Sequence, residues 1–461
     1  MVFSSLTFIY FFLTGTLAIY AAVPARWKNA VLLIASLLFY AFGEQAFVLL
    51  IIGEMLLAFG TGVLLERLRG KREGRIVLAA FLCISLGLLV LLKQSDTVFG
   101  IAMPLGISFF TFQTVSYGID VYRNDIAAER SPLRFCTYVS FFPQLVAGPI
   151  VRYGEVADAL RSRTFSLEQI GQGAFRFVTG LGKKVLLADQ LYRFYTAYQT
   201  AAEPSTVFAW AANAAFLLYV YFDFSGYSDM AIGMGTMFGF RLPENFLHPL
   251  CSRSVREFWR RWHVTLGRWF RDYVYIPMGG SRVKEVRWLF NLFTVWLLTG
   301  LWHGISWNFV LWGLYFGLLI AAESLIGRLV SRRKTAGAPA ESGRFGWLGH
   351  LYLPIAAVIG FVFFQYTDAG TATAEFGRLF GTLPFWTPAT GYYLRSFGTL
   401  LVVSVLGCLP LGQFVEKFCA RTGNGQRLLA VLKPLFMLAV LLLATASLAD
   451  GTFSPFLYFR F

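Results

Sequence analysis

Charged side chains are scarce in this sequence of 461 residues: Asp, Glu, Lys and Arg make up 14% of it, whereas soluble domains carry about 25%. Long apolar runs recur from end to end, and 57% of the residues are hydrophobic. Lipid offers no hydrogen-bond partner to a free peptide group, so such a chain must cross the membrane as helices or as a closed barrel. The runs lack the strict alternation of barrel strands. The sequence therefore predicts an all-α polytopic membrane protein.

Several catalytic motifs are missing. The five cysteines have neither the spacing of metal ligands nor that of a disulfide framework. No HExxH motif, GxSxG motif or GxxxxGK[ST] loop occurs, which argues against a zincin site, a serine hydrolase and an ATP-driven pump. The His-x4-Asp pair of another acyltransferase class is also absent. The net charge of +15 fits basic cytoplasmic loops better than a nucleic-acid partner.

The basic residues predict an orientation in the membrane. Lys and Arg favour cytoplasmic loops, so the loop 66–75 and the linker 331–346 are expected inside. Counting the apolar segments from these two loops places both ends of the chain outside the cytoplasm. The first apolar run follows no positive charge, so we interpret it as a retained helix and not as a signal peptide. We expect one integral membrane domain over residues 1–461. The apolar segments outside the middle of the chain are 6–23, 30–43, 47–65, 76–92, 351–366, 397–415 and 434–450.

The middle of the chain interrupts this pattern. Segments 104–122, 134–151 and 206–240 are apolar, but prolines, glycines and the insert YFDFSGYSD break them. Irregular backbone at membrane depth is tolerated only where it is buried in protein or lines a wet cavity, so we expect a cavity here. Within the insert, Asp223 and Asp229 are suited to orienting a histidine, pairing with arginine or serving a transporter's proton relay.

Arginine and aromatic side chains are interleaved in segment 253–271. Six arginines accompany a single acid, Glu257, and three tryptophans lie among them. At helical spacing this pattern predicts a cationic face and an aromatic face. Two functions stay open: an interfacial helix that binds anionic headgroups, or a cationic wall that binds a phosphate-rich ligand such as a coenzyme A thioester.

His303 stands near the centre of residues 291–317, which include no Asp, Glu, Lys or Arg. A neutral histidine that is hydrogen-bonded inside a helix bundle is one explanation. The other is functional, because ionisable residues within membrane segments usually mark functional sites. Burial favours the neutral imidazole, which can accept a proton from a hydroxyl. That is the chemistry of acyl transfer from a thioester to an alcohol.

Five sequence blocks carry a resemblance to a known family. They are PLGISFFTFQTVSYGIDVYR (104–123), QLVAGPIVRY (144–153), FDFSGYSDMAIGMGTMFGFRLPENF (222–246), REFWRRWHVTLGRWFRDYVYIPMGG (256–280) and LLTGLWHGISWNFVLWG (297–313). Together they resemble the membrane-bound O-acyltransferase (MBOAT) family, and most of all its bacterial branch typified by the alginate O-acetylation membrane protein. The similarity covers nearly the whole chain, but segments 325–350 and 367–395 carry no family motif.

The resemblance implies a fold and a site. The fold would be a ring of roughly 11 transmembrane helices, with re-entrant and interfacial helices around a thinned centre. An outer funnel and a cytoplasmic tunnel would meet at the catalytic His303, with His263 as the second characteristic histidine. The candidates for binding the donor or the substrate are Arg260, Arg261, Arg268, Asp229, Trp302 and Asn308.

The resemblance also implies a reaction. An acetyl group would pass from a cytoplasmic thioester, most simply acetyl-CoA, to a hydroxyl on an extracytoplasmic partner protein or an exported polysaccharide, with no bound cofactor or metal. The protein would lie among the lipids of the bacterial cytoplasmic (inner) membrane and work with an extracytoplasmic acetyltransferase. Transfer to peptidoglycan, D-alanyl transfer, a proton-coupled transporter and a non-catalytic scaffold are the alternatives.

Overall fold

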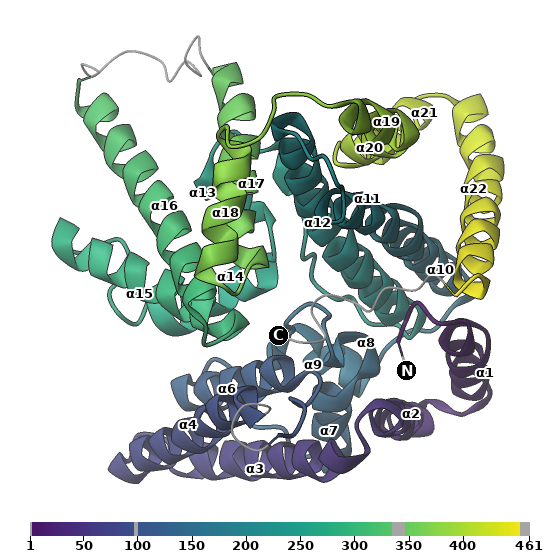
Figure 1. Ribbon diagram of the computed structural model, residues 1–461. Helices are drawn as coiled ribbons and strands as arrows, with labels where there is room; N and C mark the ends of the chain where they lie inside the picture. Colours follow the sequence, from purple (N-terminus) through teal and green to yellow (C-terminus); the bar gives the residue numbers. More distant parts are fainter. Residues whose placement is uncertain (1, 96–99, 334–345, 452–461) are drawn as a thin grey trace. The chain divides into compact units, whose positions relative to one another are not determined.

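The computed structural model describes residues 2–95, 100–333 and 346–451, and every regular element within these ranges is a helix (Figure 1). The chain divides into two compact units. Unit 1 consists of Met1–Gly182, Gly226–Glu244 and Met437–Phe461, and unit 2 of Lys183–Ser225 and Asn245–Phe436. Two long helices, α12 (Thr206–Met237) and α22 (Gly423–Ala449), contribute residues to both units.

Unit 1 is built on helices that pack through small residues. Its other helices are η1 (Phe8–Leu13), α1 (Thr14–Ala22), η2 (Ala25–Trp27), α2 (Lys28–Gly43), η3 (Gln45–Phe47), α3 (Val48–Arg67), α4 (Arg72–Lys93), α6 (Ile107–Arg123), α7 (Pro132–Ser140), α8 (Phe142–Leu145), α9 (Tyr153–Arg161) and α10 (Leu167–Gly182). Helices α3, α4 and α6 lie side by side (Figure 1). A Cβ at Gly62 of α3 would lie 2.5 Å from the ring of Tyr117 in α6, so glycine permits this close approach.

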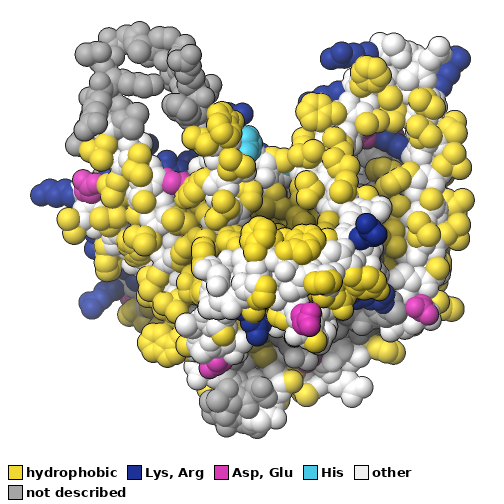
Figure 2. Space-filling view, turned by 45° about the horizontal axis from the view of Figure 1, so that its top comes forward, with side chains coloured by type: hydrophobic (Ala, Val, Ile, Leu, Met, Phe, Trp, Pro, Cys, Tyr) yellow, Lys and Arg dark blue, Asp and Glu magenta, His cyan; other side chains and the backbone are white. Residues whose placement is uncertain are grey.

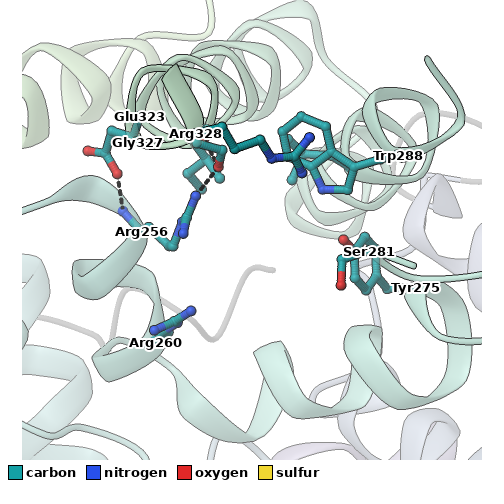
Figure 3. A pocket seen from close by; sticks show the side chains of 11 residues that line it. Arg256, Arg260, Tyr275, Ser281, Trp288, Glu323, Gly327 and Arg328 are labelled. Carbon is teal, nitrogen blue, oxygen red and sulfur yellow. Dashed lines mark hydrogen bonds between the residues drawn. The ribbon is translucent and has the colours of Figure 1, made fainter. Parts of the chain in front are cut away.

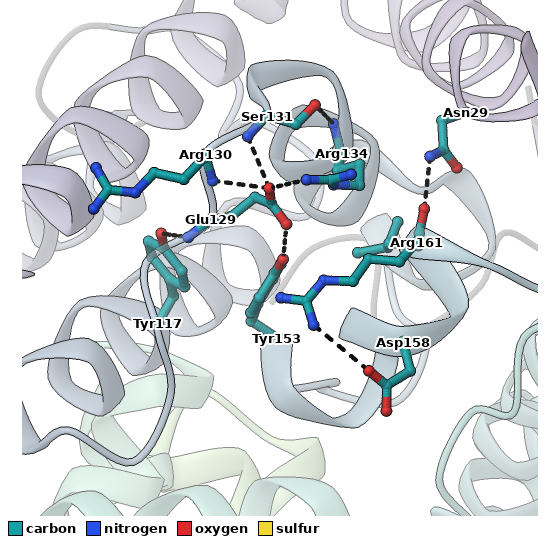
Figure 4. Close-up of polar contacts among 10 residues, drawn as sticks. Asn29, Tyr117, Glu129, Arg130, Ser131, Arg134, Tyr153, Asp158 and Arg161 are labelled. Carbon is teal, nitrogen blue, oxygen red and sulfur yellow. Dashed lines mark hydrogen bonds and ion pairs between the residues drawn. The ribbon is translucent and has the colours of Figure 1, made fainter. Parts of the chain in front are cut away.

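A buried carboxylate anchors the loop between α6 and α7 (Figure 4). Glu129 accepts hydrogen bonds from the Arg134 guanidinium and the Ser131 N–H, both at 2.7 Å, and from the Tyr153 hydroxyl. Its own N–H donates to the Tyr117 hydroxyl at 3.0 Å. Burial alone would raise the pKa of Glu129, but the hydrogen bonds from Arg134, Tyr153 and Ser131 outweigh it and lower the pKa to about 2. The ionised carboxylate therefore ties α6, α7 and α9 together.

Unit 2 holds the histidine-bearing segments. Its other helices are η4 (Lys183–Ala188), α11 (Asp189–Gln199), η5 (Pro249–Cys251), α13 (Val255–Arg261), α14 (Val264–Phe270), η6 (Arg271–Tyr275), α15 (Glu285–His303), α16 (Trp307–Arg333), η7 (Gly346–Leu348), α17 (Gly349–Gln365), α18 (Ala369–Leu379), α19 (Pro388–Ser396), α20 (Gly398–Gly407) and α21 (Leu411–Cys419). Helices α15 and α16 pack along each other. A Cβ at Gly313 would lie 2.4 Å from the carbonyl oxygen of Trp296, so the absence of a side chain lets the two backbones meet.

The helices bear out a multi-pass membrane protein. Six helices of the described part are long and apolar enough to span a membrane, or up to seven if α20 and α21, which meet at a 63° bend, form one span. Hydrophobic side chains cover much of the visible surface in Figure 2, with few charged ones among them. Among the exposed apolar side chains of the described residues, Phe11 and Leu49 are 74% and 79% exposed. Such a surface suits lipid and not water. The count of roughly 11 helices stays a prediction.

Two segments differ from what the sequence predicts. The apolar run 134–151 divides into α7 and the short α8, because Phe141 and Pro143 end one helix and begin another. The segment 253–271 is not one amphipathic helix but two short ones, α13 and α14, with a break at Trp262–His263. His263 has φ 44°, a left-handed conformation that an α-helix cannot contain. The expected outer tail at 452–461 and most of the linker 331–346 lie outside the described residues.

Candidate active site

His303 is the last residue of α15 and is only 5% exposed. Aromatic rings surround its imidazole: those of Trp302, Trp312 and Phe364 lie edge-on at centroid distances of 4.7, 5.0 and 5.1 Å, and that of Phe309 is stacked at 5.9 Å. This enclosure excludes water from the ring. A neutral imidazole in an enclosed site of this kind can act as a base.

The glycines on both sides of His303 have a packing role. A Cβ at Gly304 would lie 2.6 Å from the ring of Phe309, and one at Gly300 would lie 2.3 Å from the Phe309 carbonyl oxygen. Both glycines therefore let the start of α16 close over the end of α15. The GLWHG pattern is explained by this contact, which presses Phe309 against the His303 ring.

His263 is a second buried histidine, at the break between α13 and α14, and is 3% exposed. Its Nδ1 lies 3.0 Å from Asn245 Oδ1. The backbone N–H of Thr265 also donates to that Asn245 atom, which must therefore be the amide oxygen, since a backbone N–H cannot accept. An amide oxygen only accepts, so Nδ1 of His263 carries the proton and Nε2 carries the lone pair.

The environment of His263 keeps it neutral. Burial lowers its pKa to about 3. Its Nε2 is buried and makes no hydrogen bond to any residue that the structure describes. The ring of Phe224 packs edge-on against it at 4.7 Å. A buried acceptor without a donor is costly, so Nε2 is suited to a hydroxyl supplied by a ligand.

Trp302 joins the two histidines. Its ring lies 4.7 Å from that of His303 and 5.9 Å from that of His263, so both imidazoles contact one indole. Residues that are 40 positions apart in the sequence are thereby brought into one site. No group of three or more His, Cys, Asp and Glu side chains in the described ranges is arranged to hold a metal ion.

Asn308 follows the loop after His303 and is buried. Its side-chain oxygen accepts a hydrogen bond from the Ser306 hydroxyl, and its amide nitrogen lies 3.5 Å from the carbonyl oxygen of Phe364. Asn308 also lines a cavity of about 510 Å³, together with Trp307, Tyr366 and other residues of α16, α17 and α18. The lining residues Asn308 and Phe363 are followed directly in the sequence by Phe309 and Phe364, which pack on His303.

The three candidate arginines have different surroundings. Arg260 is exposed on α13 and lines a cavity of about 680 Å³ (Figure 3). Arg261 forms an ion pair with Glu257 one turn earlier, at 2.5 Å. Arg268, on α14, is not among the residues that line this cavity. The segment therefore does not present its arginines as a single cationic face.

Both aspartates of the polar insert are ion-paired. Within unit 1, Asp229 lies 2.6 Å from the Arg176 guanidinium, which also binds Glu244 at 2.7 Å. Within unit 2, the buried Asp223 lies 2.7 Å from the ammonium of Lys184, which also binds Asp189 at 2.8 Å. These partners explain how carboxylates are tolerated in an apolar helix.

Sequence reasoning missed Asn245, Thr265 and Lys184. Asn245 stands in the block LPENF, but no spacing rule connects it with a histidine 18 residues later. Lys184 comes directly after α10, and no spacing of charges in the sequence around it indicates that Asp223 is one of its partners. The two remaining histidines have local contacts: Nδ1 of His248 lies 3.2 Å from the Cys408 carbonyl oxygen, and His350 Nε2 accepts a hydrogen bond from Arg253.

Comparison with known proteins decides the family. Residues 97–363 match the membrane-bound O-acyltransferase family. The chain belongs to this family. It is 33% identical to the probable alginate O-acetylase AlgI of Pseudomonas putida over the full length of both chains. It is 34% identical to the peptidoglycan O-acetyltransferase of Helicobacter pylori, over 70% of each chain.

A third relative is named for the transfer of a different group, D-alanine. The teichoic acid D-alanyltransferase of Bacillus subtilis is 29% identical over 47% of this chain and 58% of its own. As a membrane-bound O-acyltransferase, the protein is an enzyme that transfers an acyl group to a hydroxyl. The sequence-based assignment to this family and to O-acyl transfer is confirmed.

Proposed function

We propose that this enzyme moves an acetyl group, or a related acyl group, from a cytoplasmic thioester across the membrane to a hydroxyl on an extracytoplasmic partner protein or an exported polysaccharide. The observation that carries the proposal is the contact of two buried histidines, His303 and His263, with one indole, that of Trp302. A dry pair of imidazoles suits transfer of a proton from an alcohol, because competing water is excluded.

His303 acts as the general base in this proposal. Its imidazole takes the proton of the acceptor hydroxyl while the hydroxyl oxygen attacks the thioester carbonyl carbon. The carbon–sulfur bond then breaks, and the thiolate leaves as a thiol after it takes a proton from the imidazolium. The products are an ester and a free thiol, and His303 returns to its neutral form.

His263 positions the acceptor. Because its Nδ1 proton is held by Asn245, its Nε2 is a hydrogen-bond acceptor. In this form it accepts from a hydroxyl but has no proton to offer to a thioester carbonyl. The reacting hydroxyl gives its single proton to His303, so the proposal gives His263 a second hydroxyl of the acceptor, and not the thioester, as its ligand.

In this proposal the two substrates approach the histidine site from opposite sides of the membrane. The cavity beside Asn308 lies at the start of α16, whereas the basic linker follows the other end of that helix. Since basic loops favour the cytoplasm, we assign the Asn308 cavity to the acceptor side. Arg260, Arg261 and Arg268 attract the phosphates of acetyl-CoA on the cytoplasmic side.

The proposed orientation of the chain in the membrane also rests on the preference of basic loops for the cytoplasm. We assign the chain to the bacterial inner membrane, as one integral domain over residues 1–461, with both ends outside the cytoplasm. A ring of about 11 helices around a thinned centre, in the fold of the family, would let both substrates reach His303. No bound cofactor takes part in the proposed reaction.

The acceptor polymer is proposed to be an exopolysaccharide of the alginate type, reached through an extracytoplasmic acetyltransferase. Similarity to an alginate O-acetylase over the full chain supports this choice. Peptidoglycan acetylation is the second candidate, supported by a relative of similar identity over a shorter part. D-alanyl transfer is less well supported than either, because the teichoic acid D-alanyltransferase is 29% identical over only 47% of this chain. A transporter relay is disfavoured because Asp223 and Asp229 each pair with a cation.

Membrane vesicles test the direction of transfer. Right-side-out vesicles from producing cells are loaded with acetyl-CoA that is labelled in the acetyl group. The proposal predicts label in an external ester and free coenzyme A inside, and predicts neither with His303→Ala. Escape of intact labelled acetyl-CoA, or an external label that persists in His303→Ala, would contradict it.

A further inference from the structure

A polar cavity of unit 2 lies between α13, α15 and α16 and has a volume of about 680 Å³ (Figure 3). Three arginines line it, one from the start of α13, one from its end and one from the last turns of α16: Arg256, Arg260 and Arg328. Tyr275, Ser281 and Trp288 add two hydroxyls and an indole. A recess of this size has room for a small anionic group and its immediate substituents.

The positive charge of the cavity exceeds what its single acid can neutralise. Glu323 is the only carboxylate among the lining residues. Its two oxygens already accept the backbone N–H groups of Val255 and Arg256, at 2.6 and 3.0 Å. Glu285, outside the lining, reaches Arg328 only at 3.9 Å. The cavity is therefore cationic, and an anion entering it replaces no existing strong ion pair.

Contacts hold two of the arginines in place. The Arg256 guanidinium donates a hydrogen bond to the hydroxyl of Ser324. The Arg328 guanidinium lies over the indole of Trp288, with its central carbon 4.2 Å from the ring centroid. Preorganised guanidinium groups bind phosphate oxygens well, because each offers several N–H donors in a fixed fork.

The surroundings of the cavity are apolar. Leu292 and Ile320 form part of its wall. Phe290 on α15 and Ile326 and Leu329 on α16, which are one or two residues from Trp288 and Arg328 in the sequence, are more than half exposed. These exposed side chains are on the same two helices as the cavity residues, and they offer acyl chains an apolar surface. Basic pockets between membrane helices commonly bind anionic lipid headgroups.

We propose that this cavity binds the phosphate of an anionic glycerophospholipid, with its acyl chains against the exposed apolar side chains of α15 and α16. The proposal does not depend on the acyl-transfer reaction. Its defining residues, Arg256 and Arg328, are not among the arginines proposed to attract the donor; Arg260 is common to both. The donor's nucleotide phosphates offer the same chemistry and are the alternative source that the experiment must separate.

Lipid binding to the purified full-length protein tests the proposal. The protein is placed in phosphatidylcholine nanodiscs, and binding of added phosphatidylglycerol is followed by native mass spectrometry and by the thermal unfolding midpoint. Arg256→Gln with Arg328→Gln should weaken phosphatidylglycerol binding at least about tenfold, since each charge-assisted hydrogen bond contributes on the order of a tenfold factor or more. Arg287→Gln is the matched control, because Arg287 is exposed on the first turn of α15 but does not line the cavity.

The outcomes separate the sources. Loss of phosphatidylglycerol binding in the double variant but not in Arg287→Gln supports the proposal. An equal loss of phosphatidylglycerol binding in the double variant and in Arg287→Gln would mean that general surface charge causes the binding, and this would overturn the proposal. Displacement of phosphatidylglycerol by acetyl-CoA, or loss of acetyl-CoA binding alone, assigns the cavity to the donor and also overturns it. If the double variant does not fold, Arg328→Gln alone gives the same comparison, because the contacts of its guanidinium within the described residues are those with Trp288 and, at 3.9 Å, with Glu285.

Discussion

Nδ1 of His263 donates a hydrogen bond to Asn245 Oδ1 at 3.0 Å, and this contact determines which nitrogen of the buried imidazole faces the site. Asn245 also accepts from the Thr265 hydroxyl at 3.0 Å, so the acceptor is itself held in place. The orientation of His263 thus depends on a residue that has no proposed contact with either substrate. Asn245 is a positioning residue.

Replacing Asn245 tests this dependence. Asn245→Leu removes the acceptor and should lower kcat by roughly 10- to 100-fold, the range found when a metal-bound histidine loses the partner that orients it. Asn245→Asp keeps an oxygen at that place and should restore most of the activity. The measurement is release of coenzyme A from acetyl-CoA at matched membrane levels. Equal activity of the Leu and Asp variants would contradict the positioning role.

The glycine contacts beside His303 predict a loss of stability. Gly300→Ala places a methyl group against the Phe309 backbone, and the shift that this requires should cost about 1–3 kcal/mol. Gly267→Ala is the control, because a Cβ at Gly267 meets nothing within 4 Å. Thermal unfolding in detergent compares them. A similar midpoint for both variants would show that α15 and α16 pack less closely than described.

The ion cluster around Lys184 predicts a large effect from a single substitution. Lys184→Met removes the cation from two buried carboxylates, Asp189 and Asp223, and should destabilise the protein by about 3–5 kcal/mol. Lys183→Met, at the neighbouring and less buried position, should cost far less. Adding Asp189→Asn and Asp223→Asn to Lys184→Met should recover part of the loss. Unfolding midpoints in detergent measure all three, and a neutral Lys184→Met would refute the cluster's role.

Acid should weaken the loop held by Glu129. The pKa of Glu129 is about 2 in the folded protein and near 4.5 in an unfolded chain. Its contribution is therefore fully present above pH 4.5 and is lost as the pH falls towards 2. Tyr153→Phe removes one donor, which raises the folded pKa, lowers stability at neutral pH and reduces the loss on acidification. Unfolding midpoints from pH 7 to 3 test this, with Tyr122→Phe as control; identical pH curves for wild type and Tyr153→Phe would contradict it.

Much of the helical framework follows from the sequence. The expected segments 47–65 and 76–92 correspond to α3 and α4, because long apolar runs leave the backbone no other way to satisfy its hydrogen bonds in lipid. The polar insert of 206–240 does not interrupt α12. Lys184 and Arg176 stabilise its carboxylates, and these partners lie 39 and 53 residues away in the sequence, which no local pattern indicates.

The candidate site was predicted in part. The motifs identified His303 and His263, and the structure brings both to Trp302. The pattern of arginines at 253–271 predicted one continuous helix, and this was wrong. The left-handed backbone at His263 ends α13, and the side chains then turn to different environments. Helical periodicity cannot reveal such a break, because no proline marks it and the apolar spacing Phe258, Trp262, Leu266, Phe270 continues across it. The roles of the six candidate binding residues stay predictions.

The most direct test of the account compares His303→Ala with His350→Ala at matched membrane levels. His350 is exposed and lies outside the site, so its variant controls for loss of a histidine. Release of coenzyme A from acetyl-CoA and acetylation of the exported polymer are measured together. The account predicts that both fall at least about a hundredfold in folded His303→Ala, the minimum expected for loss of a general base, and stay unchanged in His350→Ala. Acetylation at the wild-type rate in His303→Ala would contradict it and make the histidine structural.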